Sequence, residues 1–283
     1  MKTALITGAS SGIGKQTALA LAKLEYRLIL VARDLSKGQR AVDEIKSQFP
    51  ETEVSFTSLD TTHFDSVREF ADKLRSEGQP IDVMVLNAGL FTPKLKLSKS
   101  GHEYMFAATH LGHFLLTHEL LALLKRSNDP RIVVTSSVAH WAGYFTDFFK
   151  LKSVSSSSLL MAAPFASYGR SKLANLLFVR GFDQRVPGVK INAFHPGAVQ
   201  TDIWRDTPSL FQRLIGPMLV TEQQGASTQI WLASSPDLTA SGEYFVNKKK
   251  ALTSPLSQKA AMIDGLWDYS LSELGINKFG EPE

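Results

Sequence analysis

Residues 3–14 read TALITGASSGIG, in which an apolar, β-branched run passes directly into a glycine-rich turn. The run Thr3–Thr7 has the composition of a buried strand, and Lys15–Leu24 has the apolar spacing of a helix. A glycine turn between a strand and a helix lets a pyrophosphate approach the backbone, where the helix N-terminus offers free N–H donors. This placement predicts dinucleotide binding, although Gly12 and Gly14 could serve packing alone. The residues expected to bind are Gly8, Ser10, Ser11, Gly12, Ile13 and Gly14.

Short apolar runs alternate with helical patterns along the rest of the chain. The expected strands are Thr3–Thr7, Arg27–Ala32, Glu53–Leu59, Asp82–Leu86, Arg131–Thr135, Lys190–Phe194 and Glu243–Val246. The expected helices are Lys15–Leu24, Ser36–Phe49, Thr62–Ser76, His102–Lys125, Phe165–Phe182 and Thr221–Ala233. Such alternation predicts right-handed crossovers and a parallel sheet with helices on both faces. We therefore expect one doubly wound α/β domain over residues 1–283, with a mostly parallel, seven-stranded sheet.

Composition and spacing exclude several classes of function. The 283 residues carry a net charge of +4 and include no cysteine, which excludes disulfides, thiolate catalysis and cysteine ligation of a metal. His110 and His113 lack a third ligand at metal-binding spacing, so we predict no metal site. The basic run Lys248–Lys250 is interpreted as a solvated loop, with a weak attraction to phosphate-bearing surfaces as the alternative. We expect no binding of nucleic acid. No stretch approaches the roughly 20 apolar residues of a membrane span, which predicts a cytoplasmic protein.

Tyr168 and Lys172 stand four residues apart and therefore share one face of a predicted helix. An ammonium group beside a phenol favours the phenolate, so we expect the pKa of Tyr168 to fall below its usual value of about 10. Upstream, Ser136 and Ser137 close an apolar strand, and a seryl hydroxyl there could hold a carbonyl oxygen. Such a site could donate a proton to an oxygen while a cofactor delivers hydride to its carbon. The pair alone carries little weight, because tyrosine and lysine at helical spacing often occur by chance.

Two segments, 141–164 and 202–220, interrupt the alternation and leave the carboxyl ends of predicted strands. Ligands of open parallel sheets bind beyond those ends, so we expect both segments to form walls of a substrate pocket. Both are apolar for surface loops, which argues against a role as plain connections. Their apolar side chains include Trp141, Phe145, Phe148, Phe149, Trp204, Phe211, Leu214 and Met218. Residues 203–220 are expected to act as a lid, with peripheral contact with a lipid surface as the alternative.

The predicted second strand ends at Ala32-Arg33-Asp34, where an NAD-selective site usually places an acidic side chain. Arg33 could instead pair with a 2′-phosphate, which favours NADP(H), although it could also be an exposed surface arginine. Asp34 is expected to serve the start of the following helix. Asp60 could accept a hydrogen bond from an adenine amino group.

The turn Asn87-Ala88-Gly89 follows the predicted fourth strand, Asp82–Leu86. It would let the backbone pass close beneath a cofactor. A plain turn is the alternative, and Asn87 could equally tie neighbouring strands together.

In this order the pieces resemble the short-chain dehydrogenase/reductase family, and finer features resemble its retinol-dehydrogenase-like branch. The matching pieces are Thr7-Gly8-x-x-x-Gly12-x-Gly14, Asn87-Ala88-Gly89, Ser137, Tyr168-x-x-x-Lys172, His110-Leu111-Gly112-His113-Phe114 and His195-Pro196-Gly197. The resemblance implies a single Rossmann-type domain in which Tyr168 is the general acid or base and Lys172 lowers its pKa and binds the nicotinamide ribose. Ser137 would orient the substrate oxygen. The residues implied to line the nicotinamide are Pro196, Gly197, Val199 and Thr201.

The chain departs from the family pattern at Thr109, where the family usually has an asparagine that helps to hold a water between the lysine and solvent. A threonine has no amide, so we expect a differently held water or slower turnover.

The leading hypothesis is an NADP(H)-dependent oxidoreductase that interconverts a carbonyl and an alcohol on an apolar small molecule. A catalytically silent dinucleotide-binding sensor and a reductase of a conjugated C=C bond are the alternatives. The long helices predicted over 102–125 and 165–182 could pack in a homodimer or homotetramer, although a monomer is also compatible with the sequence.

Overall fold

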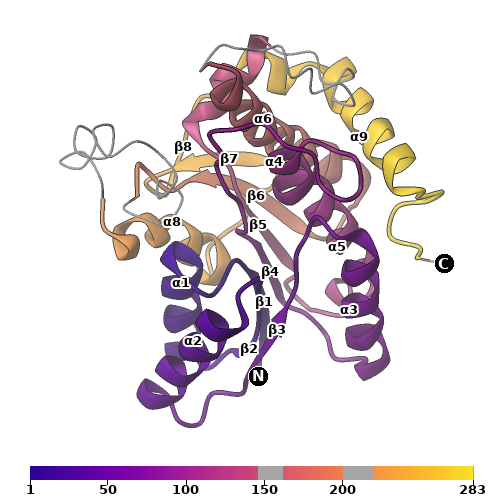
Figure 1. The fold of residues 1–283 in the computed structure, drawn as a ribbon. Coiled ribbons are helices and arrows are strands. Elements are labelled where there is room, and N and C mark those ends of the chain that lie inside the picture. Colours follow the sequence, from indigo (N-terminus) through magenta and orange to yellow (C-terminus); the bar gives the residue numbers. More distant parts are fainter. Residues whose placement is uncertain (146–161, 200–219, 283) are drawn as a thin grey trace.

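The computed structural model describes residues 1–145, 162–199 and 220–282, and an eight-stranded sheet runs through its centre (Figure 1). The strands lie in the order β3-β2-β1-β4-β5-β6-β7-β8. All neighbours are parallel except β7 and β8. The bounds are β1 Thr3–Thr7, β2 Arg27–Ala32, β3 Val54–Ser58, β4 Val83–Leu86, β5 Arg131–Thr135, β6 Lys190–His195, β7 Glu243–Val246 and β8 Lys249–Lys250. The predicted doubly wound class is confirmed.

Helices cover both faces of the sheet, because its central strands are apolar on both sides. Every residue of β1, β4 and β5 is buried. One core lies between the sheet and α1, α2 and α8, and a second lies between the sheet and α3, α5, α6 and α9 (Figure 1). The helix bounds are α1 Gly12–Lys23, α2 Leu35–Gln48, α3 Phe64–Glu77, α4 Tyr104–Phe106, α5 Gly112–Leu124, α6 Ala162–Arg185, α8 Glu222–Ser234 and α9 Ala260–Leu274. None of the helices in these described ranges is long and apolar enough to cross a membrane.

The eighth strand corrects the sequence prediction of seven. The lysine run expected to be a solvated loop instead turns at Asn247 and Lys248, whose φ angles of 48° and 62° are both positive. Two consecutive residues of positive φ match the twist of a tight hairpin, so the chain returns antiparallel to β7. Lys250 then pairs with Glu243 at 2.6 Å. The run remains exposed, but it closes the edge of the sheet.

The predicted helix over 102–125 contains a break, since a π-helical turn at Ala107–Leu111 joins α4 to α5. The sequence analysis also missed α9, which packs on α6 through Trp267 and Phe178, with ring centroids 6.4 Å apart. Every residue of α5 except Ala122 is buried within the chain itself. Much of the α5 and α6 surface that was considered for a partner is therefore covered by α3, α9 and the residues after α9.

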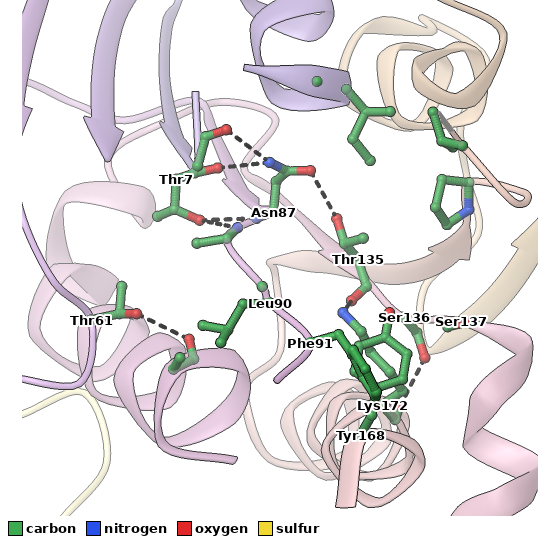
Figure 2. A pocket seen from close by; sticks show the side chains of 18 of the residues that line it. Thr7, Thr61, Asn87, Leu90, Phe91, Thr135, Ser136, Ser137, Tyr168 and Lys172 are labelled. Carbon is green, nitrogen blue, oxygen red and sulfur yellow. Dashed lines mark hydrogen bonds between the residues drawn. The ribbon is translucent and has the colours of Figure 1, made fainter. Parts of the chain in front are cut away.

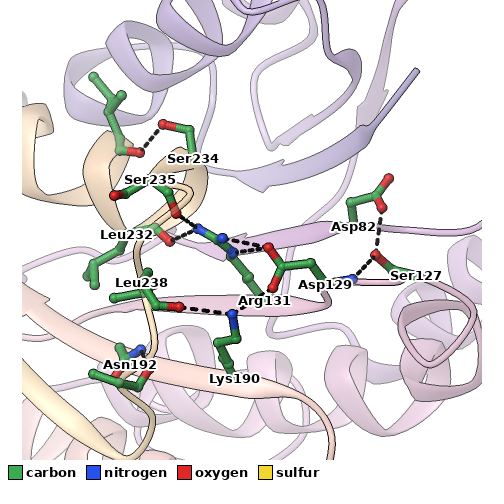
Figure 3. A network of polar contacts seen from close by, with 12 residues as sticks. Asp82, Ser127, Asp129, Arg131, Lys190, Asn192, Leu232, Ser234, Ser235 and Leu238 are labelled. Carbon is green, nitrogen blue, oxygen red and sulfur yellow. Dashed lines mark hydrogen bonds and ion pairs between the residues drawn. The ribbon is translucent and has the colours of Figure 1, made fainter.

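A charged network fixes the amino ends of β5 and β6 (Figure 3). Asp129 accepts from Arg131 at 2.5 Å and from Lys190 at 2.8 Å. Arg131 also donates to the carbonyl of Ser235, the C-cap residue of α8, at 2.7 Å. Burial alone would raise the pKa of Asp129, but the hydrogen bonds and charges of Arg131 and Lys190 outweigh it and lower that pKa to about 2.

Candidate active site

One cavity of about 990 Å³ lies along the carboxyl edge of the sheet. It is lined by residues that directly follow six parallel strands, on both sides of the point between β1 and β4 where the strand order reverses. Open α/β sheets bind their ligands at this place. The lining includes Gly8, Arg33, Asp60, Asn87, Ser137 and Pro196, one from beyond each strand.

The glycine-rich turn forms one wall of this cavity. Gly8 and Gly12 have φ angles of +67° and +59°, which glycine adopts without strain, and at Gly8 an added Cβ would also lie 2.9 Å from the Cα of Ala88. Gly14 does not line the cavity; a Cβ there would lie 2.3 Å from the carbonyl oxygen of Gly8. Its role is therefore close packing of α1 under the loop, one of the two alternatives drawn from the sequence. The cavity-lining residues of the turn are Gly8, Ser10, Ser11, Gly12 and Ile13.

Asn87 ties the strands beneath the cavity together (Figure 2). Its Nδ2 donates to the carbonyls of Thr7 at 3.0 Å and Gly8 at 3.3 Å. Its Oδ1 accepts from Thr135 and from Gln229, both at 3.4 Å. Asn87 thus links β1, β5 and α8 just below the turn. Ala88 and Gly89 follow it along the cavity wall.

The two serines after β5 point to different places. Ser136 is buried and donates to the carbonyl of Lys172 at 2.8 Å, so it joins the strand to α6. Ser137 lines the cavity, and its hydroxyl shares a hydrogen bond with that of Tyr168. The structure therefore brings Ser137, and not Ser136, to the phenol, as the sequence analysis expected.

Tyr168 and Lys172 both face the cavity from α6 (Figure 2). The Lys172 Nζ lies 5.5 Å from the centre of the Tyr168 ring and donates to the carbonyl of Thr135 at 3.0 Å. Burial raises the pKa of Tyr168 to about 12, against a smaller lowering by Ser137, and burial lowers the pKa of Lys172 to about 8. The predicted lowering of the tyrosine pKa below 10 is wrong, because desolvation of the buried phenol outweighs the lowering by the Ser137 hydrogen bond.

An apolar wall stands beside these hydroxyls. Phe91 packs against Phe165, with ring centroids 4.8 Å apart, and meets the edge of Tyr168 at 5.9 Å. Val138 and Trp141 line the cavity while remaining 52% and 47% exposed, so its mouth presents apolar side chains to solvent. Trp141 belongs to the predicted pocket segment 141–164; most of that segment, and all of 202–219, lies outside the described residues.

The opposite part of the cavity is polar. Arg33 lines it, and its Nη1 donates to the hydroxyl of Tyr104 at 2.7 Å. The Asp34 carboxylate caps α2 by accepting from the N–H of Lys37 at 2.8 Å, as predicted. The Asp60 Oδ1 accepts from the backbone N–H and the hydroxyl of Thr62, at 2.9 and 2.8 Å. Asp60 therefore shapes the turn after β3 and also lines the cavity.

Residues after β6 close the remaining side. Pro196, Gly197 and Val199 line the cavity, and Gly197 has a φ angle of +86°. Thr201, expected beside them, lies outside the described residues. His195 also faces the cavity. Its pKa is lowered to about 4, mainly by burial and to a smaller extent by the charges of His140 and Lys172.

Comparison with known proteins identifies the family of the chain. A model of the short chain dehydrogenase family matches residues 2–147, just over half of the chain. The chain belongs to this family. It is 37% identical to retinol dehydrogenase 12 of Mus musculus over 282 residues, which cover 97% of this chain and 87% of that protein. Retinol dehydrogenase 14 of Homo sapiens is 36% identical over 299 residues, covering 98% and 87%. The predicted retinol-dehydrogenase-like branch is thereby confirmed.

Solved structures share the fold. An alcohol dehydrogenase from the archaeon Thermococcus sibiricus, complexed with 5-hydroxy-NADP, superposes with a TM-score of 0.67 at 27% identity, covering 87% of this chain and 95% of that one. L-Sorbose reductase from Gluconobacter frateurii, complexed with NADPH and L-sorbose, gives 0.69 at 19% identity, covering 86% and 94%. The second likeness bears on the fold alone. As a short-chain dehydrogenase, the chain is an oxidoreductase of a family that uses nicotinamide dinucleotides.

His113, which the sequence analysis considered only as a metal ligand and as part of a family motif, also holds this dehydrogenase site together. The His113 Nδ1 lies 3.1 Å from the carbonyl oxygen of Thr109, and its Nε2 lies 2.9 Å from the hydroxyl of Thr7. Burial lowers the pKa of His113 to about 3, so the ring is neutral and connects the π-helical turn to β1. The Thr109 hydroxyl is buried and has no hydrogen-bond partner in the described part of the chain. The partners of these two residues across the fold follow from no local pattern in the sequence.

Proposed function

We propose that this chain is an NADP(H)-dependent oxidoreductase that interconverts a carbonyl and an alcohol on an apolar small molecule, such as a retinal-like or lipid-derived aldehyde or ketone. The observation that carries the proposal is that Ser137, Tyr168 and Lys172 line the same cavity as the glycine-rich turn. A hydroxyl pair that can hold an oxygen thus stands in reach of a dinucleotide that would lie along the strand ends.

The residues present fit such a cofactor. A backbone cradle at Gly8 and Gly12, where the positive φ angles favour glycine, leaves room for a pyrophosphate beside the start of α1. Gly89 leaves space next to the Lys172 Nζ, since an added Cβ would lie 3.3 Å from that nitrogen. Arg33 would hold the 2′-phosphate, and Pro196, Gly197 and Val199 would line the nicotinamide. When bound, the nicotinamide supplies or accepts the hydride.

The protein's own task is to place and protonate the substrate oxygen. With a pKa of about 12, the Tyr168 hydroxyl keeps its proton at neutral pH, which is the form that carbonyl reduction consumes. Ser137 and Tyr168 would both donate to the carbonyl oxygen as negative charge grows there. Lys172, with a pKa of about 8, is mostly protonated at pH 7, and its positive charge would stabilise the phenolate that remains.

The class of substrate follows from the wall beside this site. Phe91, Phe165, Val138 and Trp141 offer apolar contacts next to the two hydroxyls. Pockets of this composition bind ligands mainly through apolar burial, with a few polar groups that fix orientation. Relatives named retinol dehydrogenase, at 35–37% identity over nearly the whole chain, support a carbonyl or alcohol on a hydrophobic body.

A substrate screen with both cofactors tests the proposal. Purified protein would be mixed with NADPH or NADH and a panel of aliphatic, aromatic and polyene aldehydes, and products would be identified by mass spectrometry. We expect alcohols, with NADPH preferred to NADH and long apolar aldehydes preferred to short polar ones. Saturated carbonyl products would favour reduction of a C=C bond. Binding of NADPH without turnover of any compound would favour the silent sensor.

A further inference from the structure

Tyr104 contacts two cations of the polar part of the cavity at once. Its hydroxyl accepts from the Arg33 Nη1 at 2.7 Å, and its ring lies under the Lys96 Nζ, 4.0 Å from the ring centre. All three residues line the cavity, yet Arg33 follows β2 and the other two belong to the segment between β4 and α5. Tyrosine is suited to this double contact, since it offers a polar tip and a negative ring face.

The position of Tyr104 is fixed from both sides. Glu103 is fully buried, and its carboxylate caps the helix by accepting from the N–H groups of Met105 at 3.1 Å and Phe106 at 2.9 Å. The N–H of Tyr104 donates to the carbonyl of Lys96 at 2.9 Å, beside an antiparallel bridge between Leu97 and Glu103. Tyr104 and Lys96 therefore sit on one braced hairpin rather than on independent loops.

We propose that Tyr104 and Lys96 complete the 2′-phosphate subsite of this protein, with Tyr104 as a positioning residue for Arg33 and Lys96 as a second cation. The inference rests on the proposed function, because it assigns the cofactor's extra phosphate to this part of the cavity. Tyr104 takes one of the five N–H groups of Arg33 and leaves the others for the phosphate. Holding the guanidinium before binding reduces the side-chain entropy that is lost when the phosphate arrives.

The charges around this subsite are mixed. Lys37 lines it, and the carboxylates of Asp34 and Asp60 line it as well. One oxygen of each carboxylate is already engaged, Asp34 by the N–H of Lys37 and Asp60 by Thr62. Arg33 and Lys96 thus share this part of the cavity with the carboxylates of Asp34 and Asp60, whose negative charge opposes phosphate binding. Removing either cation should therefore weaken phosphate binding measurably.

The test compares two ligands that differ only in the phosphate, adenosine 2′,5′-bisphosphate and adenosine 5′-monophosphate. Dissociation constants for both would be measured by calorimetry on the full chain, with no turnover involved. The wild type should bind the bisphosphate at least about tenfold more tightly, as expected for charge-assisted bonds to a phosphate. Arg33→Ala should remove most of that preference. Tyr104→Phe and Lys96→Gln should each reduce it by about three- to tenfold, while affinity for the monophosphate stays within about twofold.

Two comparisons separate positioning from general effects. In the Arg33→Ala background, Tyr104→Phe should have no further effect on the preference, because Tyr104 acts through Arg33, whereas Lys96→Gln should still reduce it. Lys99→Gln is the matched control, since Lys99 is exposed, belongs to the same segment and does not line the cavity. It removes the same charge and should leave the preference unchanged.

The outcomes distinguish this inference from the proposed function. A wild type that binds both ligands equally would overturn the NADP(H) assignment itself. A wild type with the preference, whose Tyr104→Phe and Lys96→Gln variants keep it in full, would overturn the inference alone. An equal loss for Lys99→Gln and Lys96→Gln would also overturn it, because the effect would then be diffuse charge rather than a built subsite.

Discussion

The buried cations at the two ends of β5 differ in whether a carboxylate compensates their charge. At its amino end, Arg131 lies against Asp129, which also pairs with Lys190, and the pKa of that carboxyl falls to about 2 (Figure 3). At its carboxyl end, Lys172 donates to the carbonyl of Thr135, and no carboxylate among the described residues shifts its pKa upward. The pKa of Lys172 therefore falls to about 8. A paired cation, Arg131, thus lies at one end of the strand, and Lys172 of α6, whose pKa no carboxylate of the described residues raises, lies at the other.

This difference corresponds to a structural role at the amino end of β5 and a catalytic role at its carboxyl end. Removing the partner of a buried cation leaves an uncompensated charge, so an intact pair at the amino end matters for stability. A buried cation without a carboxylate is costly, and it persists where its charge is used on something else. At the carboxyl end the charge faces Tyr168 and the cavity. Substitutions at the carboxyl end should therefore change turnover, and substitutions at the amino end should change stability.

The largest effect is expected for Tyr168→Phe, which removes the proton donor but keeps the ring against Phe91. Turnover should fall by roughly 10²–10⁴-fold, the usual contribution of general acid catalysis. NADPH affinity, measured by quenching of tryptophan fluorescence, should stay near the wild-type value. Retention of most of the activity would remove the tyrosine from the mechanism. Tyr26→Phe, at a buried tyrosine of the other core, is the matched control.

A pH profile is the next test of the carboxyl end. Because the pKa of Lys172 is about 8, its charge is present at pH 7 and is lost as the pH rises through 8. With NADPH saturating, kcat for carbonyl reduction should fall above pH 8, toward about tenfold for each further unit. A Lys172→Met variant should be slow at every pH and show no such break. A wild-type profile that stays flat to pH 9.5 would contradict the assignment of this charge to catalysis.

At the amino end, Asp129→Asn keeps the shape of the side chain and removes its charge. The free energy of unfolding should fall by about 2–4 kcal/mol, because Arg131 is left buried with its ion pair removed. Denaturant unfolding followed by circular dichroism measures this, and kcat should be unchanged. Asp264→Asn breaks the exposed pair with Arg185 and should cost at most about 1 kcal/mol.

The pH dependence of the free energy of unfolding tests the same ion pair. The pKa of Asp129 is lowered in the folded protein, so its contribution is fully present above the unfolded value of about 3.9 and is lost as pH falls toward 2. The stability difference between wild type and Asp129→Asn should thus be constant from pH 5 to 7 and shrink below pH 4. A difference that grows on acidification would show that Asp129 does not carry the effect.

The sequence predicted the strands well because they are short, uninterrupted runs buried on both faces. Thr3–Thr7, Arg27–Ala32 and Arg131–Thr135 were predicted with the bounds that the structure has. The site residues after the strands followed from the same rule, since parallel strands bring their carboxyl ends to one edge. For α9 the signal was present but missed: its buried residues Ile263, Leu266, Trp267, Ser270 and Leu274 recur at helical spacing.

Other features could not be predicted from local patterns. The pKa of Tyr168 depends on burial, which a four-residue spacing does not reveal, so the direction of its shift was predicted wrongly. The contact of Arg33 with Tyr104 joins residues 71 apart through a hairpin whose register no periodicity sets. Strand β8 depends on two residues of positive φ and is built from lysines, which are depleted in strands.

The smallest effect is expected at Thr109, where the family usually has asparagine. A Cβ added to Gly89 would lie 3.7 Å from the Thr109 hydroxyl and 3.3 Å from the Lys172 Nζ, so the hydroxyl faces the same small space as the ammonium. Asparagine has nearly the volume of threonine and would place an amide there without displacing the helix. Thr109→Asn should therefore leave NADPH affinity within about twofold and should not lower kcat. Thr109→Val removes the hydroxyl at equal size and serves as the matched comparison. A large loss of kcat in Thr109→Asn, with Thr109→Val equally slow, would show that the carboxyl end of β5 depends on this hydroxyl as well as on the uncompensated lysine.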